Sequence, residues 1–302
     1  MHNRKNRYNS TQNWAVITSK TTERHMKRIL TIQDISCVGK CSLTVALPII
    51  SAAGVETSVL PTAVLSTHTQ FQGFTFHDLT DEIPPIREHW LKERLTFDAI
   101  YTGYLGSFKQ LSLVEQLIDD FKNSENLIFV DPVMGDEGKL YVGFDQAFAD
   151  RMALFCAKAD IVVPNLTEAS FMLHEPYAGS CYDEAYIDSM LGKLLALGPK
   201  VAVLTGVSFK PGQLGVVGLD SRTGERFSYF HAELSGRYHG TGDVFASAAL
   251  GALVRGRTLF ESFKIAADFV CSSIEATLAN PNSRRYGVDF ETALPSYIRQ
   301  FS

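Results

Sequence analysis

The sequence predicts one α/β domain built on a mostly parallel sheet with helices on both faces. Short apolar runs typical of buried strands alternate along the chain with longer stretches typical of helices, and this alternation is the signature of strand–helix–strand units. The polar residues that interrupt the pattern fall where strands end, and sheets of this kind bind ligands beyond the carboxyl ends of their strands. The sequence therefore predicts an architecture and also the edge of the sheet that carries the function.

The composition is that of an ordinary globular protein. The 302 residues are 45% hydrophobic and 20% charged, which suits one large core. A formal net charge of −5 makes nucleic acid an unexpected partner. No apolar run approaches the length of a membrane span, and the five cysteines are scattered without a C-x-x-C pair. We therefore expect no membrane partner and a reducing compartment such as the cytoplasm.

Residues 1–26 are predicted to be a disordered extension of a single domain that covers residues 27–302. The segment is polar and carries five basic residues against one acidic residue, without a sustained apolar period. This composition has some similarity to an organelle transit peptide, whereas the apolar core of a secretory signal is missing. The favoured interpretation is an extension upstream of a start at Met26, or residues added for expression.

The regular pattern begins with a strand, a helix and a second strand. The apolar run 28–33 suits a buried strand, and residues 41–53 place apolar side chains on one helical face before Gly54 ends the helix. The β-branched run 57–65 predicts the next strand. The polar and aromatic stretch 66–74 is too long for a tight turn and has the character of a binding loop or lid.

The middle of the chain repeats the alternation of strands and helices. Each predicted strand is a short apolar run that stops at polar or glycine-containing residues, and the sequence between two runs is long enough for a crossover helix. Strands are predicted at 98–103, 127–130, 161–163 and 201–204, and helices at about 109–122, 144–157 and 183–197.

The last part of the chain predicts a hairpin and then only helices. The runs 213–219 and 226–231 flank Asp220-Ser221-Arg222-Thr223-Gly224, which is typical of a hairpin turn. This hairpin would add antiparallel strands at an edge of the sheet. Helices are predicted within 239–254, after a glycine-rich turn, and at about 258–279 and 289–299.

The most informative stretch is the glycine-rich turn Gly240-Thr241-Gly242-Asp243. Such a turn at the start of a helix leaves several backbone N–H groups unpaired, and together with the helix dipole they bind an anion, most often a phosphate. A carboxylate in the same turn is explained if Asp243 takes a proton from a hydroxyl that attacks a phosphoryl group. The alternative is a plain helix cap, for which Asp and Gly are common.

Acidic and amide residues follow two of the predicted strands. Asp131 comes directly after a buried strand, and a carboxylate there suits Mg²⁺ or its waters. Asn165 and Glu168 have the i, i+3 spacing of one helix face and could hold a water-mediated Mg²⁺ that bridges nucleotide phosphates. Each has a structural alternative: Asp131 could cap the next turn, and Asn165 and Glu168 could form a capping box.

Three further side chains at strand ends could contact a ligand. His68 could hydrogen-bond a substrate ring or hydroxyl, or be an ordinary surface histidine. Tyr104 could stack on a flat ligand or only pack, and Lys40 could neutralise a phosphate or be solvated. The sequence contains neither a Walker-type phosphate loop nor a G-x-G-x-x-G motif, so phosphoryl transfer would use a different apparatus.

At this point the motifs resemble a known family. The turn Gly240-Thr241-Gly242-Asp243 resembles the signature of the ribokinase-like kinases, and Asn165-Leu166-Thr167-Glu168 resembles their N-x-x-E magnesium motif. Within that superfamily, three more segments resemble the pyridoxal/pyridoxamine (vitamin B6) kinases: Thr67-His68-Thr69, Thr102-Gly103-Tyr104-Leu105-Gly106-Ser107 and Asp131-Pro132-Val133-Met134-Gly135. The match runs from about Arg28 to the last helix, and the motifs occur in the same order.

The resemblance implies a ribokinase-like three-layer αβα sandwich and an ATP-dependent reaction. The enzyme would phosphorylate the 5′-hydroxymethyl group of pyridoxal, pyridoxine or pyridoxamine, the salvage route to pyridoxal 5′-phosphate. Asp243 would deprotonate that hydroxyl, and the amides of Gly240, Thr241 and Gly242 would form the anion hole for the transferred phosphoryl group.

The same resemblance implies roles at the other strand ends. Asp131 and Glu168 would organise Mg²⁺ with ATP, while Asn165 and Thr205 would lie near the nucleotide phosphates. The pyridine pocket would be lined by Asp34, His68, Thr69 and Tyr104. A monovalent cation such as K⁺ often supports this family, and a homodimer is its usual state.

The sequence departs from the family at the substrate ring. Many pyridoxal kinases have Ser directly after the Gln of the first strand, where this chain has Asp34 and places Ser36 further on. An acidic side chain at this position could favour a protonated ring nitrogen or an amine, and therefore pyridoxamine or pyridoxine over the aldehyde.

Two other functions stay open at this stage. Hydroxymethylpyrimidine kinase of thiamine synthesis shares the fold and a D-P-V-M loop, but its turn usually carries Cys where Asp243 stands, and it lacks the T-G-Y-L-G-S loop. The second is a catalytically idle vitamin- or sugar-binding protein on the same fold. The presence of Asp243 together with Asn165 and Glu168 argues against it.

Overall fold

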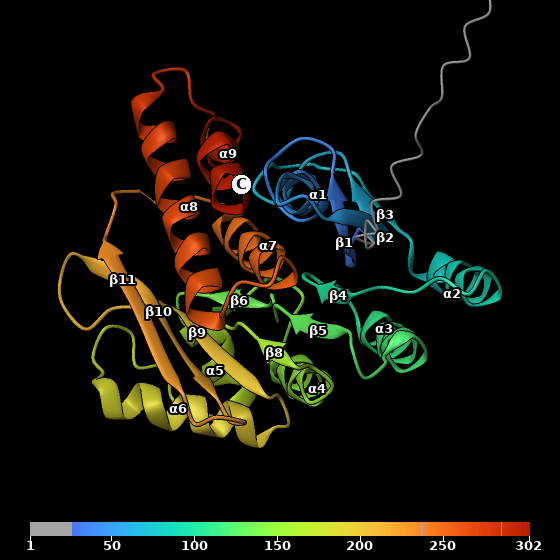
Figure 1. The fold of residues 1–302 in the computed structure, drawn as a ribbon, viewed down its shortest axis with the longest axis horizontal. Helices are drawn as coiled ribbons and strands as arrows, with labels where there is room; N and C mark the ends of the chain where they lie inside the picture. Colours follow the sequence, from blue (N-terminus) through green and yellow to red (C-terminus); the bar gives the residue numbers. More distant parts are fainter. Residues whose placement is uncertain (1–25, 237, 285) are drawn as a thin grey trace, which may run out of the picture.

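A nine-stranded sheet in the order β11-β10-β9-β8-β5-β4-β1-β2-β3 forms the centre of the computed structural model (Figure 1). The structure describes residues 26–236, 238–284 and 286–302. The predicted extension over residues 1–26 therefore lies outside the described residues, apart from Met26. No helix among the described residues is both long and apolar enough to cross a membrane.

The central strands pair in parallel, as the alternation of strands and helices predicted. They are β1 (Arg28–Ser36), β2 (Glu56–Leu65), β4 (Ala99–Thr102), β5 (Leu127–Val130), β8 (Ile161–Val162) and β9 (Val201–Val207). Most of their side chains are buried, because helices cover both faces of the sheet, and only β2, nearer the edge, is largely exposed or half-buried. This is why the strands appear in the sequence as continuous apolar runs without a polar alternation.

Antiparallel strands close both edges of the sheet. At one edge β10 (Gln213–Asp220) and β11 (Arg226–Ala232) form the predicted hairpin. At the other edge β3 (Phe76–Asp78) pairs with β2. A separate two-stranded hairpin, β6 (Gly135–Asp136) with β7 (Lys139–Leu140), follows the central strand β5. The sequence did not predict β3, β6 or β7, because strands of two or three residues are too short to show a periodic pattern.

The helices form two layers with separate apolar cores (Figure 1). One layer contains α1 (Leu43–Ala52), α7 (Thr241–Val254), α8 (Leu259–Ala279) and α9 (Phe290–Ile298), with a 3₁₀ turn at Arg299–Phe301. The other layer contains α2 (Ile83–Lys92), α3 (Phe108–Phe121), α4 (Gln146–Cys156), α5 (Leu166–Leu173) and α6 (Glu184–Ala196), with a 3₁₀ turn at Thr80–Glu82. The predicted three-layer αβα architecture is therefore confirmed.

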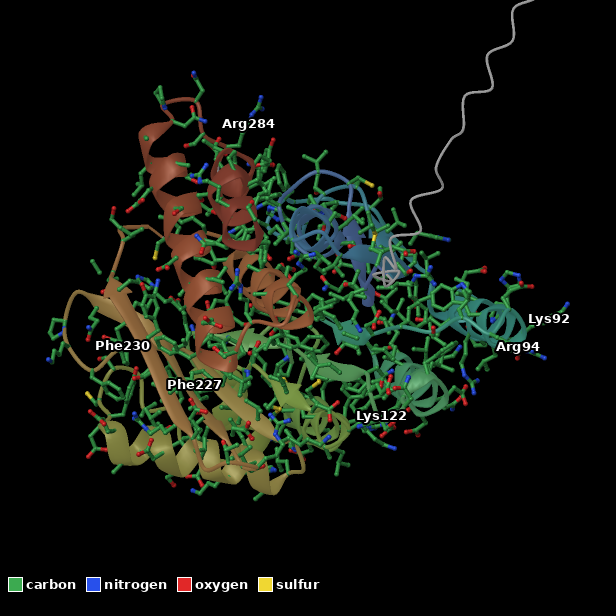
Figure 2. All side chains as sticks on the ribbon, viewed as in Figure 1. Lys92, Arg94, Lys122, Phe227, Phe230 and Arg284 are labelled. Carbon is green, nitrogen blue, oxygen red and sulfur yellow. The ribbon has the colours of Figure 1, made fainter. Side chains whose placement is uncertain are left out.

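Strand β11, at the edge of the sheet, contributes an aromatic side chain to each of the two apolar cores. Phe227 and Phe230 are labelled on this strand in Figure 2. Phe227 stacks on Phe263 of α8 with ring centroids 5.6 Å apart, whereas Phe230 contacts Phe209 in the other core at 5.4 Å. An odd spacing along a strand directs side chains to opposite faces, so each aromatic ring serves a different layer.

Three helices differ from the sequence prediction, which gave α5 only as a possible capping box at Asn165 and Glu168. No helix was predicted at α2, because Pro84 and Pro85 suggest a break; both lie at its start, where a missing N–H costs little. Helix α1 was predicted from Cys41 but begins at Leu43, because Ser42 has φ 51° and is not helical. The latter difference matters for the site, where Ser42 has a direct contact.

Candidate active site

The glycine-rich turn opens α7 as an uncapped helix N-terminus. Gly240 precedes the helix with φ 75°, and no side chain caps the first turn. A Cβ atom on Gly240 would lie 1.9 Å from the carbonyl oxygen of Lys40, so only glycine fits. The N–H groups of the first turn therefore have no side-chain partner, and their role as an anion hole stays a prediction.

The Asp243 carboxylate does not cap its own helix. Its Oδ2 accepts a hydrogen bond from the backbone N–H of Ser42 at 2.9 Å, from the loop before α1. Burial away from water raises the pKa of Asp243 to about 7. The hydrogen bond from the Ser42 N–H opposes this shift, and the nearby charge of Asp34 adds to it. A carboxylate with such a pKa can accept a proton near neutral pH.

Asp34 lies beside this loop because strand β1 is irregular at that point. The pairing of β1 with β2 shifts between Gln33 and Ile35, and such bulges re-aim side chains near functional sites. Asp34 is buried, and its carboxylate accepts hydrogen bonds from Ser42 Oγ at 2.6 Å and Ser36 Oγ at 3.3 Å. Burial raises the pKa of Asp34, which the two hydroxyl groups oppose.

Glu168 and Asn165 form the capping box at the start of α5. Glu168 accepts from the N–H of Asn165 at 2.9 Å and the N–H of Met134 at 3.1 Å, and the Asn165 side chain accepts from the N–H of Glu168 at 2.9 Å. The structural alternative considered for this pair is thus present. It also fixes the loop after β5, since the Asn165 amide donates to the carbonyl of Gly135 at 2.9 Å.

Asp131 and Glu168 make this edge of the sheet acidic. Both are buried. Burial raises the pKa of Asp131 well above its ordinary value, and the charges of Glu168 and Asp243 raise it further. Burial also raises the pKa of Glu168 to about 8, against the backbone N–H groups that it accepts. Because each buried carboxylate makes ionisation of the other less favourable, a cation bound between them would stabilise the charged form of both.

The ends of β8 and β9 bring two predicted nucleotide-binding residues together. Asn165 and Thr205 form an isolated parallel β-bridge, and Thr205 is partly buried with its hydroxyl 3.5 Å from the carbonyl of Pro164. The two residues are forty positions apart in the sequence and become neighbours because their strands are adjacent in the sheet.

His68 packs beside the glycine-rich turn and is not an isolated surface histidine. It is 4% exposed, and its ring stacks on that of His239 with centroids 5.5 Å apart. Nδ1 accepts from the Gln70 N–H at 3.2 Å, so Nε2 carries the proton and donates to the Tyr286 carbonyl at 3.3 Å. Burial lowers the pKa of His68, which keeps this neutral tautomer.

The other two residues predicted for the ring pocket differ in exposure. Thr69 is exposed on the loop after β2. Tyr104 is half-buried after β4, with its ring 5.6 Å from that of Phe144. Burial raises the pKa of Tyr104, and the charge of Asp34 adds to the shift, which places the two side chains in one electrostatic environment.

Two contacts of the loop before α1 were missed by sequence reasoning. The N–H of Ser42 bonds Asp243, and a backbone donor leaves no trace in the residue type. Lys40 is neither solvated nor directed at the turn: its ammonium group binds Asp289 at 2.9 Å and Glu291 at 2.8 Å. These acids are about 250 positions away along the chain, so local sequence contained no signal for them.

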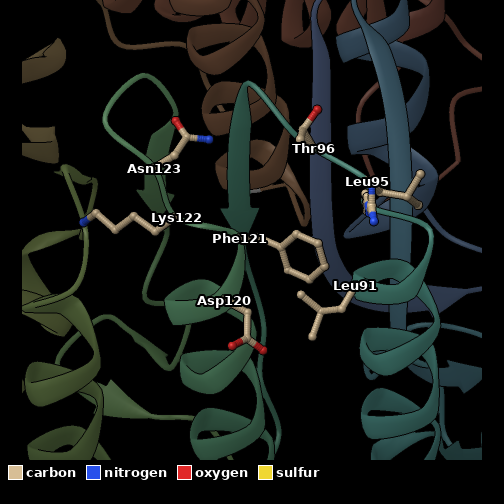
Figure 3. A pocket seen from close by; sticks show the side chains of 8 residues that line it. Leu91, Leu95, Thr96, Asp120, Phe121, Lys122 and Asn123 are labelled. Atoms are coloured by element: carbon tan, nitrogen blue, oxygen red, sulfur yellow. The ribbon is translucent and has the colours of Figure 1, made fainter.

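A separate pocket of about 290 Å³ lies at the opposite end of the sheet (Figure 3). It is formed where α2 leads into β4 and α3 leads into β5, by Leu91, Arg94, Leu95, Thr96, Asp120, Phe121, Lys122 and Asn123. Lys92, Arg94 and Lys122 mark this region in Figure 2. Because it faces the amino ends of the strands, it is not the site formed by Asp243 and Asp131.

The fold and the site together define an α/β protein with an uncapped helix N-terminus and an adjacent carboxylate. Residues 49–287 match the family described as phosphomethylpyrimidine kinase. The match covers more than half of the chain, and the chain belongs to this family of ribokinase-like kinases. The resemblance that the motifs indicated is thereby confirmed.

Individual relatives support the same placement. A pyridoxal kinase from Pasteurella multocida is 27% identical over 278 residues, 85% of this chain and 91% of the relative. A Bacteroides thetaiotaomicron protein provisionally assigned as a phosphomethylpyrimidine kinase, with a crystal structure that includes pyridoxal, is 38% identical with a TM-score of 0.86, covering 90% of this chain and 96% of its own. The pyridoxal kinase from Lactobacillus plantarum is 32% identical with a TM-score of 0.83, covering 91% and 98%.

Proposed function

We propose that this chain is a pyridoxal kinase, which transfers the terminal phosphoryl group of ATP to the 5′-hydroxymethyl group of a vitamin B6 vitamer. The observation that carries the proposal is the pairing of Asp243, with its pKa near 7, and the uncapped N-terminus of α7 at the carboxyl edge of the sheet. A base and an anion hole on one turn are what transfer to an alcohol requires. The pyridoxal kinases among the relatives support the choice of acceptor.

The chain's own residues account for the proton and for the phosphoryl charge. Asp243 accepts the proton of the attacking hydroxyl, while the amides of Gly240, Thr241 and Gly242 hold the equatorial oxygens of the phosphoryl group in transfer. The Ser42 N–H keeps the Asp243 carboxylate in place for this step. Asn165 and Thr205 lie together at the neighbouring strand ends and orient the nucleotide phosphates.

Mg²⁺ fits the acidic edge formed by Asp131 and Glu168. No three His, Cys, Asp or Glu side chains among the described residues are gathered closely enough for a complete metal site, and Mg²⁺ typically uses one or two carboxylates together with substrate phosphates. The raised pKa values of the two buried acids are the observation that favours a cation there. When bound with ATP, Mg²⁺ would neutralise phosphate charge. The family resemblance adds K⁺ as an expected activator.

The described residues are organised around one nine-stranded sheet with a helical layer on each face, which supports a single kinase domain over 27–302. We further propose a cytoplasmic homodimer that acts without nucleic acid or a membrane, on the basis of the acidic net charge, the scattered cysteines and the usual state of pyridoxal kinases.

The test of the function is an ATP-consumption screen against pyridoxal, pyridoxine, pyridoxamine and hydroxymethylpyrimidine. We expect turnover with at least one B6 vitamer and a kcat/KM at least about tenfold lower for the pyrimidine, a difference of about 1.4 kcal/mol in transition-state binding. A reaction without acceptor serves as the control. Turnover restricted to the pyrimidine would replace this function by hydroxymethylpyrimidine kinase, and no turnover with any acceptor would favour a binding protein.

Asp34 is expected to influence which vitamer is preferred. Its buried carboxylate lies beside Ser42 and shares the electrostatic environment of Tyr104. We expect wild type to favour pyridoxamine or pyridoxine over pyridoxal, and Asp34→Ser to reduce that preference by about threefold to tenfold in relative kcat/KM, since a serine carries no charge to pair with an amine or a protonated ring. Ser36→Ala, which removes a long hydrogen bond to Asp34 and keeps the carboxylate, is the matched control. Equal efficiency on all three vitamers in wild type and Asp34→Ser would disprove this role.

A further inference from the structure

Lys40 connects the catalytic loop to the C-terminal part of the chain. Its side chain is 18% exposed, and its ammonium group binds Asp289 at 2.9 Å and Glu291 at 2.8 Å, at the start of α9. The same group lies 5.7 Å from the ring centroid of Phe290. Lysines are usually solvated. Because Lys40 is instead held between two acids and an aromatic ring, it anchors its own loop to the start of α9.

The backbone of Lys40 makes a second connection to the same segment. Its N–H donates to the carbonyl of Tyr286 at 3.0 Å, the carbonyl that also accepts from Nε2 of His68. A Cβ atom on Gly287 would lie 2.5 Å from the Cβ atom of Lys40. The two backbone segments therefore approach each other as closely as a glycine allows. The segment before α9 is thus packed directly on Lys40.

The opposite side of Lys40 touches the anion-binding turn. The Lys40 carbonyl occupies the place where a Cβ atom of Gly240 would be. Two residues further on, the N–H of Ser42 donates to the Asp243 carboxylate. Lys40 therefore lies between the start of α9 and the two elements that carry the proposed chemistry.

Ser42 holds a conformation that needs external support. Its φ of 51° and ψ of −135° are sparsely populated for a residue with a side chain, and such strain persists only where the surroundings impose it. Its hydroxyl is held by Asp34 at 2.6 Å and its N–H by Asp243 at 2.9 Å. At the other end of the same short loop, the ion pairs of Lys40 supply further support for this conformation.

We infer that Lys40 is a positioning residue, which holds the loop of residues 39–42 against α9 so that the Ser42 N–H reaches Asp243 and the Lys40 carbonyl sets the position of Gly240. The inference rests on the proposed kinase function. It assigns a part in catalysis to Asp289 and Glu291, which have no contact with the turn themselves. It also excludes Lys40 as a direct phosphate ligand.

The test compares Lys40→Met with Lys40→Arg in the full chain. Methionine keeps the apolar stem and removes the charge, so we expect kcat to fall up to about 100-fold, the scale of loss that a misplacement of about 1 Å causes. The KM for ATP should stay within about threefold of wild type. Arginine can bind both acids and should restore most of kcat. Glu291→Gln, at a more exposed position, should give a smaller fall in the same direction.

Lys200→Met is the matched control. Lys200 binds Asp160 at 2.7 Å, between β8 and β9 at their amino ends, far from the turn. This variant should leave kcat within about twofold of wild type, because Lys200 itself is exposed and the pair lies at the amino ends of the strands. A Lys40→Met variant that raises the KM for ATP with kcat unchanged would show a phosphate contact and overturn the inference.

Hydrogen exchange of the backbone amides separates this inference from the kinase function itself. In Lys40→Met the amides of residues 39–44 should exchange at least about tenfold faster than in wild type, whereas Lys40→Arg and Lys200→Met should match wild type. This readout needs no substrate, so it tests the anchor even if the chain phosphorylates no vitamer. Unchanged exchange in Lys40→Met would overturn the anchor.

Discussion

Asp243→Asn is expected to remove turnover while binding of both substrates is largely retained. Asparagine has nearly the same shape and its oxygen can still accept the Ser42 N–H that bonds Asp243 at 2.9 Å, but it cannot take up a proton. Loss of a general base lowers rates by roughly 100- to 10,000-fold. We expect kcat to fall within that range, with the dissociation constants of a vitamer and of a non-hydrolysable ATP analogue within about threefold of wild type by calorimetry.

The pH profile gives the same assignment an independent check. Because the surroundings raise the pKa of Asp243 to about 7, the carboxyl group is protonated and inactive below that pH and becomes an acceptor above it. The kcat/KM of wild type should therefore rise with pH up to about 7 and then level off. The residual activity of Asp243→Asn should not show this rise with pH, the acid limb of the profile.

A surface acid in the same helical layer provides the control for Asp243. Asp268 on α8 accepts a hydrogen bond from Tyr229 at 2.6 Å and has no contact with the turn. Asp268→Asn should keep both kcat and the acid limb of wild type. If Asp243→Asn retained kcat within about tenfold of wild type, Asp243 would not be the base.

Gly240→Ala is expected to have the second large effect, on catalysis and on stability together. The new Cβ atom would lie 1.9 Å from the carbonyl oxygen of Lys40, and alanine is disfavoured at φ 75°. The turn must move away from the loop before α1, which separates the anion-binding amides from their position beside Asp243. We expect kcat to fall by about 100-fold and the free energy of unfolding by about 1–3 kcal/mol.

Gly242 offers a control within the same turn. A Cβ atom on Gly242 meets nothing within 4 Å, and its φ is not positive. Gly242→Ala keeps the backbone amide and should leave kcat within about tenfold of wild type and the denaturant midpoint nearly unchanged. Equal losses in Gly240→Ala and Gly242→Ala would show that the close approach of the Lys40 carbonyl does not determine the turn.

The fold was predictable wherever the pattern was long enough. The parallel strands and the hairpin of β10 and β11 are apolar runs whose burial is visible in composition. Short elements lacked that signal: all three residues of β3 are exposed, and β6 and β7 have two residues each. Helix α2 was hidden by Pro84 and Pro85, which are tolerated only because they begin the helix.

The candidate site was predictable as a set of strand ends. Parallel strands in one sheet place their carboxyl ends along one edge, so Asp34, Asp131, Asn165 and Thr205 were expected to lie together before any contact was known. The chemical roles assigned to these residues and to Asp243 stay predictions. The structure adds that Asn165 and Glu168 cap α5, because each side chain bonds the other's backbone N–H.

The sequence by itself determined the class of fold, the edge of the sheet that carries the site and the family, because these depend on periodic burial and on motifs with few structural meanings. Only the tertiary structure decided how the glycine-rich turn is held. Gly240 is required by the Lys40 carbonyl, Asp243 is held by the Ser42 N–H, and Lys40 is anchored at Asp289 and Glu291. These contacts join residues some 200 to 250 positions apart. They involve backbone atoms and strained dihedral angles, which residue identity does not encode.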